Sequence, residues 1–118
     1  MKKIKRAAFQ GDMMIIRRTR ADLPEGCKEL PVKFGEAVVA HSETGHHHVA
    51  SGITAHLEAS AMQAFIIAKG DVVIDHRRQA DQHETLQLLF DDDPGGEVVW
   101  EIRRQREHTP EGWRRVED

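Results

Sequence analysis

Hydrophobic and polar residues alternate along most of this chain, and this pattern predicts short strands. Between residues 53 and 58, for example, Ile53, Ala55 and Leu57 alternate with polar side chains. Alternation over four to eight residues is typical of a β-strand with one buried face. Further strands are expected at residues 13–18, 32–34, 36–41, 64–68, 72–76, 86–90 and 98–102.

Glycine-containing turns between these runs predict two β-hairpins. The first joins residues 64–68 to 72–76 through Lys69-Gly70-Asp71, and the second joins 86–90 to 98–102 through an Asp- and Gly-rich loop. We expect both hairpins to keep one face in water. The only helical candidate is the Ala-rich stretch 57–64, which is too short to be held by helix propensity alone.

The number and spacing of these strands predict an all-β fold. Seven or so short strands within 118 residues favour a small antiparallel β-barrel or β-sandwich with at most one short helix. A chain of this length is expected to form one domain, residues 1–118, because smaller pieces could not build a core. No apolar run is long enough to span a bilayer, and no signal peptide is recognised at the start, so we expect no membrane association.

The charge of the chain bears on nucleic-acid binding, and its cysteine content bears on its cellular location. The formal net charge is −3, and acidic residues lie close to every basic cluster, so nucleic-acid binding is the weakest of the functional hypotheses. Cys27 is the single cysteine and cannot form an internal disulfide, which favours a reducing, cytoplasmic location. We interpret Cys27 as an ordinary turn residue, since no activating group is visible beside it.

Histidine is the candidate chemistry, because the chain has eight and three are consecutive in the stretch H-S-E-T-G-H-H-H-V-A, residues 41–50. If this stretch enters a strand, His46 and His48 share one face and His47 points to the other. Two imidazoles separated by two residues on a strand are about 6–7 Å apart and can bind one metal ion at roughly 2.1 Å each.

A third ligand must come from elsewhere in the chain. His76 is the best candidate, because it continues the apolar face formed by Val72 and Ile74. His83 can return toward His76 after a polar loop, while His56 is placed on the surface because it alternates with apolar residues. The predicted metal ligands are therefore His46, His48, His76 and His83; possible additional ligands or supporting groups are His41, Glu43 and Glu107.

A histidine set without thiolates suits a divalent ion such as Zn, Fe, Mn or Ni, and composition does not choose among them. Two other interpretations stay open. The histidines can be structural or surface residues that bond to backbone carbonyls, or they can perform acid–base chemistry without a metal. Whether the protein is an enzyme also stays open, as no nucleophile arrangement is visible in the sequence.

Several motifs resemble known families. The Thr44-Gly45-His46 turn with His48 resembles the first motif of cupins locally, although the acidic residue that cupins place three or four positions later is absent. A wider resemblance, to a family of small uncharacterised bacterial and phage proteins, is carried by Q-G-D at 10–12, T-G-H-x-H at 44–48, a strand ending in His76, and Q-R-E at 105–107. This resemblance implies that His46, His48 and His76 form a site; His83 is displaced and His108 replaces an aromatic residue. It implies no particular activity.

The leading hypothesis from sequence is thus a small β protein with a histidine cluster that binds a divalent metal or an anionic small molecule. The alternative is a non-enzymatic accessory or adaptor protein that binds another protein through its β surface, with structural histidines. Self-association as a homodimer is a further expectation, because small β proteins must protect their edge strands.

Overall fold

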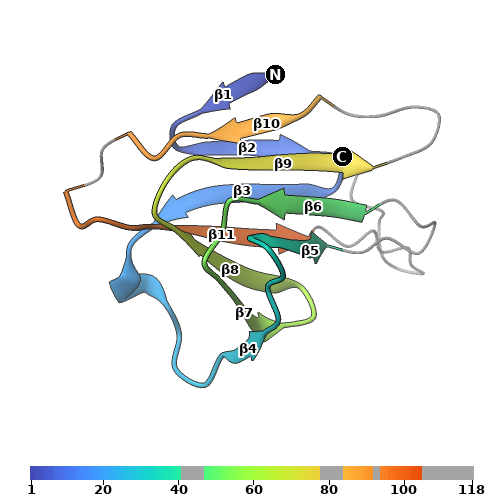
Figure 1. Ribbon diagram of the computed structural model, residues 1–118. Coiled ribbons are helices and arrows are strands. Elements are labelled where there is room, and N and C mark those ends of the chain that lie inside the picture. The colour runs from blue at the N-terminus through green and yellow to red at the C-terminus, as the bar shows by residue number, and fades with distance from the viewer. Residues whose placement is uncertain (41–46, 78–83, 92–93, 105–118) are drawn as a thin grey trace, which may run out of the picture.

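Two β-sheets packed face to face form the protein in the computed structural model, which describes residues 1–40, 47–77, 84–91 and 94–104 (Figure 1). The five-stranded sheet has the order β1-β10-β9-β6-β5, and the six-stranded sheet has the order β2-β3-β11-β8-β7-β4. The elements are β1 (Lys2–Ile4), β2 (Ala7–Gln10), β3 (Met13–Arg18), the 3-10 turn η1 (Arg20–Asp22), β4 (Lys28–Leu30), β5 (Glu36–Ala40), β6 (His47–Ser51), β7 (Ala55–Ser60), β8 (Gln63–Ala68), β9 (Val72–Arg77), β10 (Leu86–Leu88) and β11 (Val98–Arg104).

The expected all-β class is confirmed, in its sandwich form. Every pairing is antiparallel except that of β1 with β10, and within the described residues the sheets do not close into a barrel. The same residues include no helix that is long and apolar enough to cross a membrane.

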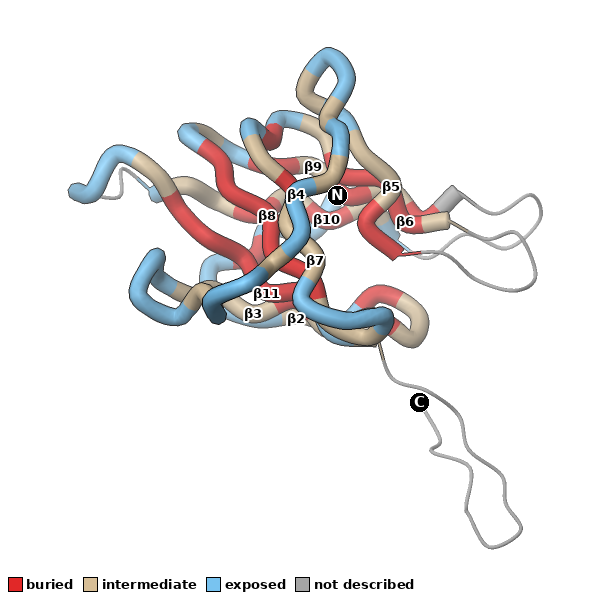
Figure 2. Tube along the Cα trace, turned by 90° about the horizontal axis from the view of Figure 1, so that it is seen from below, coloured by how far each residue is buried: buried red, intermediate tan, exposed pale blue. Residues whose placement is uncertain are grey.

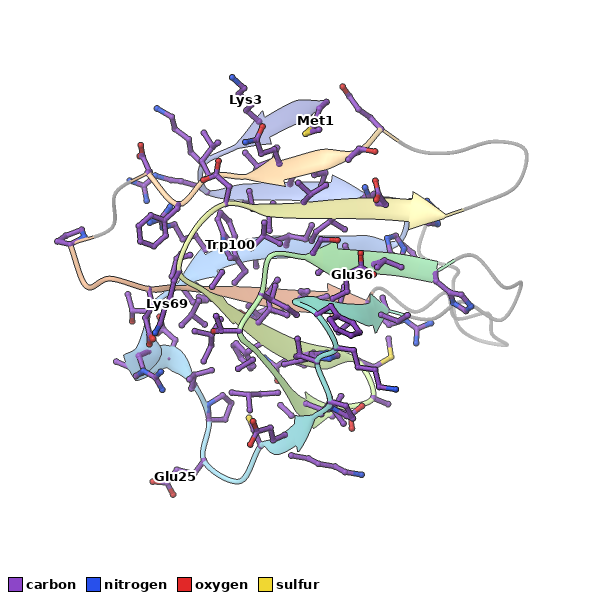
Figure 3. All side chains as sticks on the ribbon, viewed as in Figure 1. Met1, Lys3, Glu25, Glu36, Lys69 and Trp100 are labelled. Atoms are coloured by element: carbon purple, nitrogen blue, oxygen red, sulfur yellow. The ribbon has the colours of Figure 1, made fainter. Side chains whose placement is uncertain are left out.

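The main core lies between the two sheets. Figure 2 shows buried residues concentrated along the central strands, and Figure 3 places Trp100 near the middle of the molecule. Trp100 has no exposed surface, and the Arg17 guanidinium lies 5.6 Å from its ring centroid. Burial of each large apolar side chain stabilises the fold by roughly 1.5–3 kcal/mol. The largest side chains without exposure are Trp100, Met13, Ile15, Ile66, Ile74 and Leu88.

A second apolar cluster covers the outer face of the six-stranded sheet. Phe65, Ile67 and Val99 are buried there, and Leu23 and Cys27 from the segment after η1 pack against them. As a result β11 is buried on both faces from Val98 to Ile102. The expectation that this strand keeps one face in water is therefore wrong.

A buried carboxylate lies on this same outer face. Glu101 is 2% exposed and accepts hydrogen bonds from Arg103 (2.6 Å), Arg18 (2.7 Å) and Gln63 (2.7 Å). Burial raises the pKa of Glu101, but the bonds from the two arginines and the amide outweigh it and lower the pKa from 4.5 to about 2. Glu101 therefore stays ionised and joins β11 to both neighbouring strands.

Both predicted hairpins are wrong, because each predicted turn crosses between the sheets. The turn at residues 69–71 leads from β8 in the six-stranded sheet to β9 in the five-stranded sheet, and β10 and β11 are separated in the same way. The observed hairpins are β2–β3, β5–β6 and β7–β8. A short glycine turn can join two strands of one sheet or connect one sheet to the other. In both arrangements the two strands present apolar residues to the same core.

The helix considered at residues 57–64 is also absent. This stretch holds the end of β7, a turn and the start of β8, with Glu58 paired with Ala64. Alternating burial in paired strands outweighs the alanine content, because an isolated eight-residue helix gains little from propensity.

Three of the chain's connections meet at the end of the sandwich where β6 finishes. The Gly52 amide donates to the Gly35 carbonyl at 2.8 Å, and the Ile53 amide donates to the same oxygen at 3.1 Å. Gly52 has φ +92, and a Cβ at this position would lie 2.7 Å from the Asp71 carbonyl oxygen. Glycine is therefore required at residue 52 by both conformation and space.

Candidate functional site

Two of the predicted histidine ligands are neighbours at the opposite end of the sandwich. β6 begins and β9 ends there, and their antiparallel register places His48 directly across from His76 (Figure 1). His48 is 1% exposed and His76 is 6% exposed. His76 therefore continues the inner face of Val72 and Ile74, as the alternation in the sequence predicts.

The remaining predicted residues cannot be placed in the site. His46, His83, His41, Glu43 and Glu107 lie outside the described residues, so their proposed roles stay predictions. His47 starts β6 and is only partly buried, whereas His48 is buried, in agreement with the expected division of the histidine run.

The rings of His48 and His76 are stacked. Their centroids are 4.1 Å apart and their planes differ by 3°. The lone pair of an imidazole nitrogen lies in the plane of its ring, so two parallel stacked rings cannot direct nitrogens at one ion at roughly 2.1 Å each. In this arrangement His76 supports His48 by packing, and it would have to rotate to share a metal ion with it.

Gln10 determines which nitrogen of His48 carries the proton. The Gln10 Nε2 donates to the carbonyl oxygens of Ile74 (3.0 Å) and Glu84 (2.9 Å), and both of these atoms are acceptors only. The amide oxygen of Gln10 therefore faces Nδ1 of His48, 2.9 Å away. It follows that His48 Nδ1 donates a proton to Gln10 Oε1 and that, in the neutral ring, Nε2 has the lone pair.

Asp12 presents a carboxylate to this second nitrogen. Its Oδ1 lies 3.6 Å from His48 Nε2, and the Asp12 side chain is 36% exposed. A separation of 3.6 Å is too long for a hydrogen bond. Two donor atoms at about 2.1 Å from one tetrahedral ion are about 3.4 Å apart, so the observed separation suits a shared ion.

The described residues thus bring together two atoms that could coordinate an ion, and buried side chains surround one of them. No group of three or more His, Cys, Asp or Glu side chains in the described part of the chain is arranged to hold an ion. His48 and Asp12 are one nitrogen and one oxygen donor, Gln10 orients the nitrogen, and His76 packs against its ring. A complete coordination shell would need further donors besides these two.

Sequence reasoning did not assign Gln10 and Asp12 to the site. They flank Gly11, whose φ of +62 forms the tight turn between β2 and β3. The Q-G-D motif at residues 10–12 is the signal that could have found them, but it contributes only to the family resemblance and assigns no ligand. Its contact with His48 joins strands of different sheets, and alternation within a strand carries no information about such a contact.

His56 also differs from expectation, because it is 4% exposed and not on the surface. It lies on the inner face of β7, opposite Ile66 of β8. Both faces of the six-stranded sheet are covered, so its alternation with Ala55 and Leu57 did not reveal which side was the main core.

Comparison with known proteins adds no family to this description. No protein-family model, curated protein or solved structure matches the chain. The resemblances to cupins and to small bacterial and phage proteins therefore stay predictions, and the chemistry of the site is derived from its own geometry.

Proposed function

We propose that this protein binds a divalent metal ion at the histidine end of the sandwich, with His48 Nε2 and an Asp12 carboxylate oxygen as ligands. The remaining ligands are proposed to come from the predicted set, with His46 and His83 first and His76 after rotation of its ring. One observation carries the proposal: the 3.6 Å separation between these two donor atoms.

The surroundings of His48 support a metal ligand. Histidine ligands of metals commonly donate their second nitrogen to an oxygen acceptor, which sets the tautomer and the direction of the lone pair. Gln10 provides this acceptor, and two main-chain carbonyls hold its own orientation. A mixed nitrogen and oxygen set without thiolate suits Zn, Fe, Mn or Ni.

The test is direct measurement of metal binding by protein purified without a polyhistidine tag. We expect the protein to take up about one equivalent of at least one of Zn, Mn, Ni or Fe and to melt several degrees higher with it. The substitutions His48→Ala and Asp12→Asn should each weaken binding by about tenfold or more. Elemental analysis, calorimetry and thermal melting supply the measurements.

His47→Ala is the matched control, because this neighbouring histidine lies on the other side of β6. It should keep the affinity of the wild-type protein. If the wild-type protein carries no metal and none of the four ions raises its melting temperature, the proposal is wrong. Loss of binding in His47→Ala but not in His48→Ala would also contradict it.

A second candidate function is protein binding, with a second copy of the chain as the partner. It is favoured by Phe34, which is fully exposed and has a positive φ of +53 in the turn before β5. Non-glycine residues held at positive φ cluster at ligand-binding and other functional sites, so the conformation of Phe34, and not its exposure alone, favours a contact there. Sedimentation should show a dimer that Phe34→Ser dissociates; a wild-type monomer at about 100 µM would rule the dimer out.

The proposed location is a reducing compartment, the cytoplasm. Cys27 is the only cysteine of the chain, and its thiol donates to the Pro24 carbonyl at 3.4 Å. A protein with a single cysteine gains nothing internally from an oxidising environment.

A further inference from the structure

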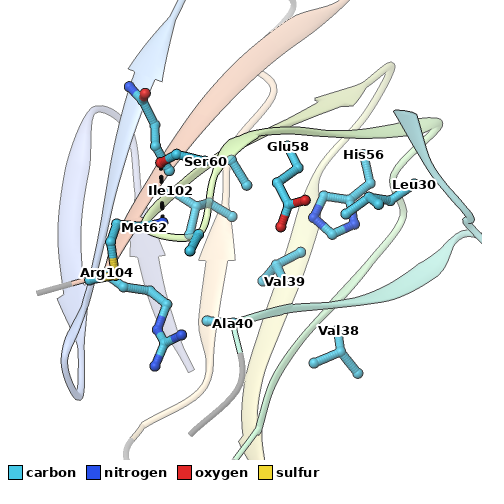
Figure 4. Close-up of a pocket in the computed structure, with 13 residues that line it drawn as sticks. Leu30, Val38, Val39, Ala40, His56, Glu58, Ser60, Met62, Ile102 and Arg104 are labelled. Atoms are coloured by element: carbon cyan, nitrogen blue, oxygen red, sulfur yellow. Dashed lines mark hydrogen bonds between the residues drawn. The ribbon is translucent and has the colours of Figure 1, made fainter. Parts of the chain in front are cut away.

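A cavity of about 290 Å³ lies between β5 of one sheet and β7, β8 and β11 of the other (Figure 4). Small side chains leave this space, since Ala40 of β5 and Ala64 of β8 both line it. The other lining residues that matter here are Val39, Ile102, His56, Glu58 and Arg104.

Charged groups of opposite sign occupy the two sides of this cavity. Figure 4 shows Glu58 with His56 on one side and Arg104 on the other, with Val39 and Ala40 between them. His56 and Glu58 lie two residues apart on the same face of β7, and Arg104 ends β11. The cavity is therefore negative at one side, apolar in the middle and positive at the other.

These charges do not neutralise each other. In the part of the chain that the structure describes, no ion pair joins Glu58 to Arg104, and the buried Nε of Arg104 has no hydrogen-bond partner. A buried donor without a partner is unfavourable, more so when it is charged, so a ligand that accepts its hydrogen bond removes that penalty.

We propose that this cavity binds a small ω-amino carboxylate. The ammonium group is held by Glu58 beside His56, the carboxylate by Arg104, and the apolar chain between them packs on Val39, Ala40 and Ile102. At roughly 30 Å³ for each water molecule in the liquid, the cavity has the volume of about ten waters, which is close to the number of non-hydrogen atoms in 6-aminohexanoate. Arginine is well suited to the carboxylate, because its planar guanidinium binds two oxygens at once.

This site is distinct from the proposed metal site. Ala40 is the cross-strand neighbour of His48, so the two sites adjoin, but Glu58 and Arg104 take no part in the contacts of His48 or Asp12. Failure of one proposal therefore leaves the other standing.

The test is calorimetric titration of the full chain with 6-aminohexanoate, hexanoate and hexylamine. We expect 6-aminohexanoate to bind about tenfold or more tightly than either analogue, because each analogue lacks one charged group. Glu58→Gln should weaken 6-aminohexanoate binding without weakening that of hexanoate. Arg104→Met should weaken 6-aminohexanoate binding without weakening that of hexylamine.

Two exposed residues provide matched controls, Glu29→Gln on β4 and Arg6→Met before β2, and both should bind as the wild type does. The proposal is overturned if 6-aminohexanoate does not bind at up to about 10 mM, or if it binds no better than its analogues. Equal affinity of the wild-type protein and both cavity variants also overturns it. Thermal melting of every variant shows whether it is folded, and 4-aminobutanoate, being shorter, should bind more weakly than 6-aminohexanoate.

Discussion

At the scale of single residues, the orientation of His48 follows from a chain of hydrogen bonds that begins at main-chain carbonyls. The carbonyls orient the Gln10 amide, and the amide in turn sets the tautomer of the imidazole. Such a series of buried hydrogen bonds is stable when every donor and acceptor has a partner, but the loss of one side chain leaves several buried polar atoms without partners.

Replacing Gln10 tests this dependence. Gln10→Met keeps the length of the side chain, yet it leaves two carbonyls and the Nδ1–H of His48 without their partner, all in a buried place. We expect a loss of about 2–3 kcal/mol in the free energy of unfolding, measured by urea denaturation.

Gln87→Met is the control, because Gln87 makes an exposed side-chain bond to Asp71 at 2.8 Å. Gln87→Met should change the free energy of unfolding by no more than about 0.5 kcal/mol. Equal effects of the two substitutions would show that the buried bonds of Gln10 carry no special weight.

Glu101 makes stability depend on pH. Its pKa falls from 4.5 to about 2 in the folded protein, so the folded state binds the proton more weakly than the unfolded chain does. The stabilisation is therefore complete above pH 4.5 and is lost as the pH falls from about 4.5 toward 2. A pKa change of this size corresponds to on the order of 3 kcal/mol.

We expect Glu101→Gln to lower the free energy of unfolding at pH 7 by about 2–3 kcal/mol and to have little effect near pH 2. Denaturation curves at the two pH values measure this difference. Glu29→Gln, on the exposed strand β4, should show no such pH dependence. A constant effect of Glu101→Gln across the pH range would contradict the assigned ion pairs.

Part of the site could be predicted from sequence at this scale, for a physical reason. Alternation on one strand tells which residues share a face, so the inward position of His76 follows from Val72 and Ile74. It does not tell what lies on the opposing sheet. Asp12 and Gln10 reach His48 across the sandwich, and only the packing of the two sheets brings them together.

At the scale of elements, the strands were largely predictable and their partners were not. The runs at residues 13–18 and 72–76 match β3 and β9 closely, because the alternation of burial is a local property. Which strands become neighbours in a sheet depends on the packing of the whole chain, and not on the local sequence of each strand. The turn at Gly70 connects two sheets, although it has the composition of a hairpin turn.

The connections between sheets are where single substitutions should have the largest effect. Gly52→Ala would force a side chain into φ +92 and place its Cβ 2.7 Å from a main-chain oxygen of residue 71. We expect a loss of about 2–4 kcal/mol in the free energy of unfolding, since neither backbone can move without disturbing a neighbouring strand.

Gly70→Ala provides the comparison, because no atom beyond its own chain neighbours lies within 4 Å of its Cβ position. It should be neutral or slightly stabilising, as an alanine restricts the unfolded chain. Chemical denaturation of both variants measures the difference. A loss of free energy of unfolding in Gly52→Ala no larger than that in Gly70→Ala would mean that residue 52 is not packed closely against the Asp71 carbonyl oxygen.

At the scale of the whole molecule, the two sheets are interwoven by one chain. The chain passes between them from β1 to β2, β4 to β5, β6 to β7, β8 to β9 and β10 to β11. Neither sheet is made of a continuous stretch of sequence, so we expect neither to fold without the other.

A single cooperative unfolding transition is therefore expected. In a Trp113→Phe background, fluorescence reports Trp100 in the core, whereas far-ultraviolet circular dichroism reports the strands of both sheets. The two denaturation curves should coincide. Separate midpoints would show that one sheet survives without the other.

The position of β11 has a consequence for synthesis in the cell. This strand lies between β3 and β8 in the middle of its sheet, yet it is the last strand along the described chain. Until the ribosome releases residues 98–104, β3 and β8 expose unpaired edges to any other β-strand nearby. A nascent chain that stops short of these residues should aggregate, because the gap it leaves is at the centre of the sheet and not at its border.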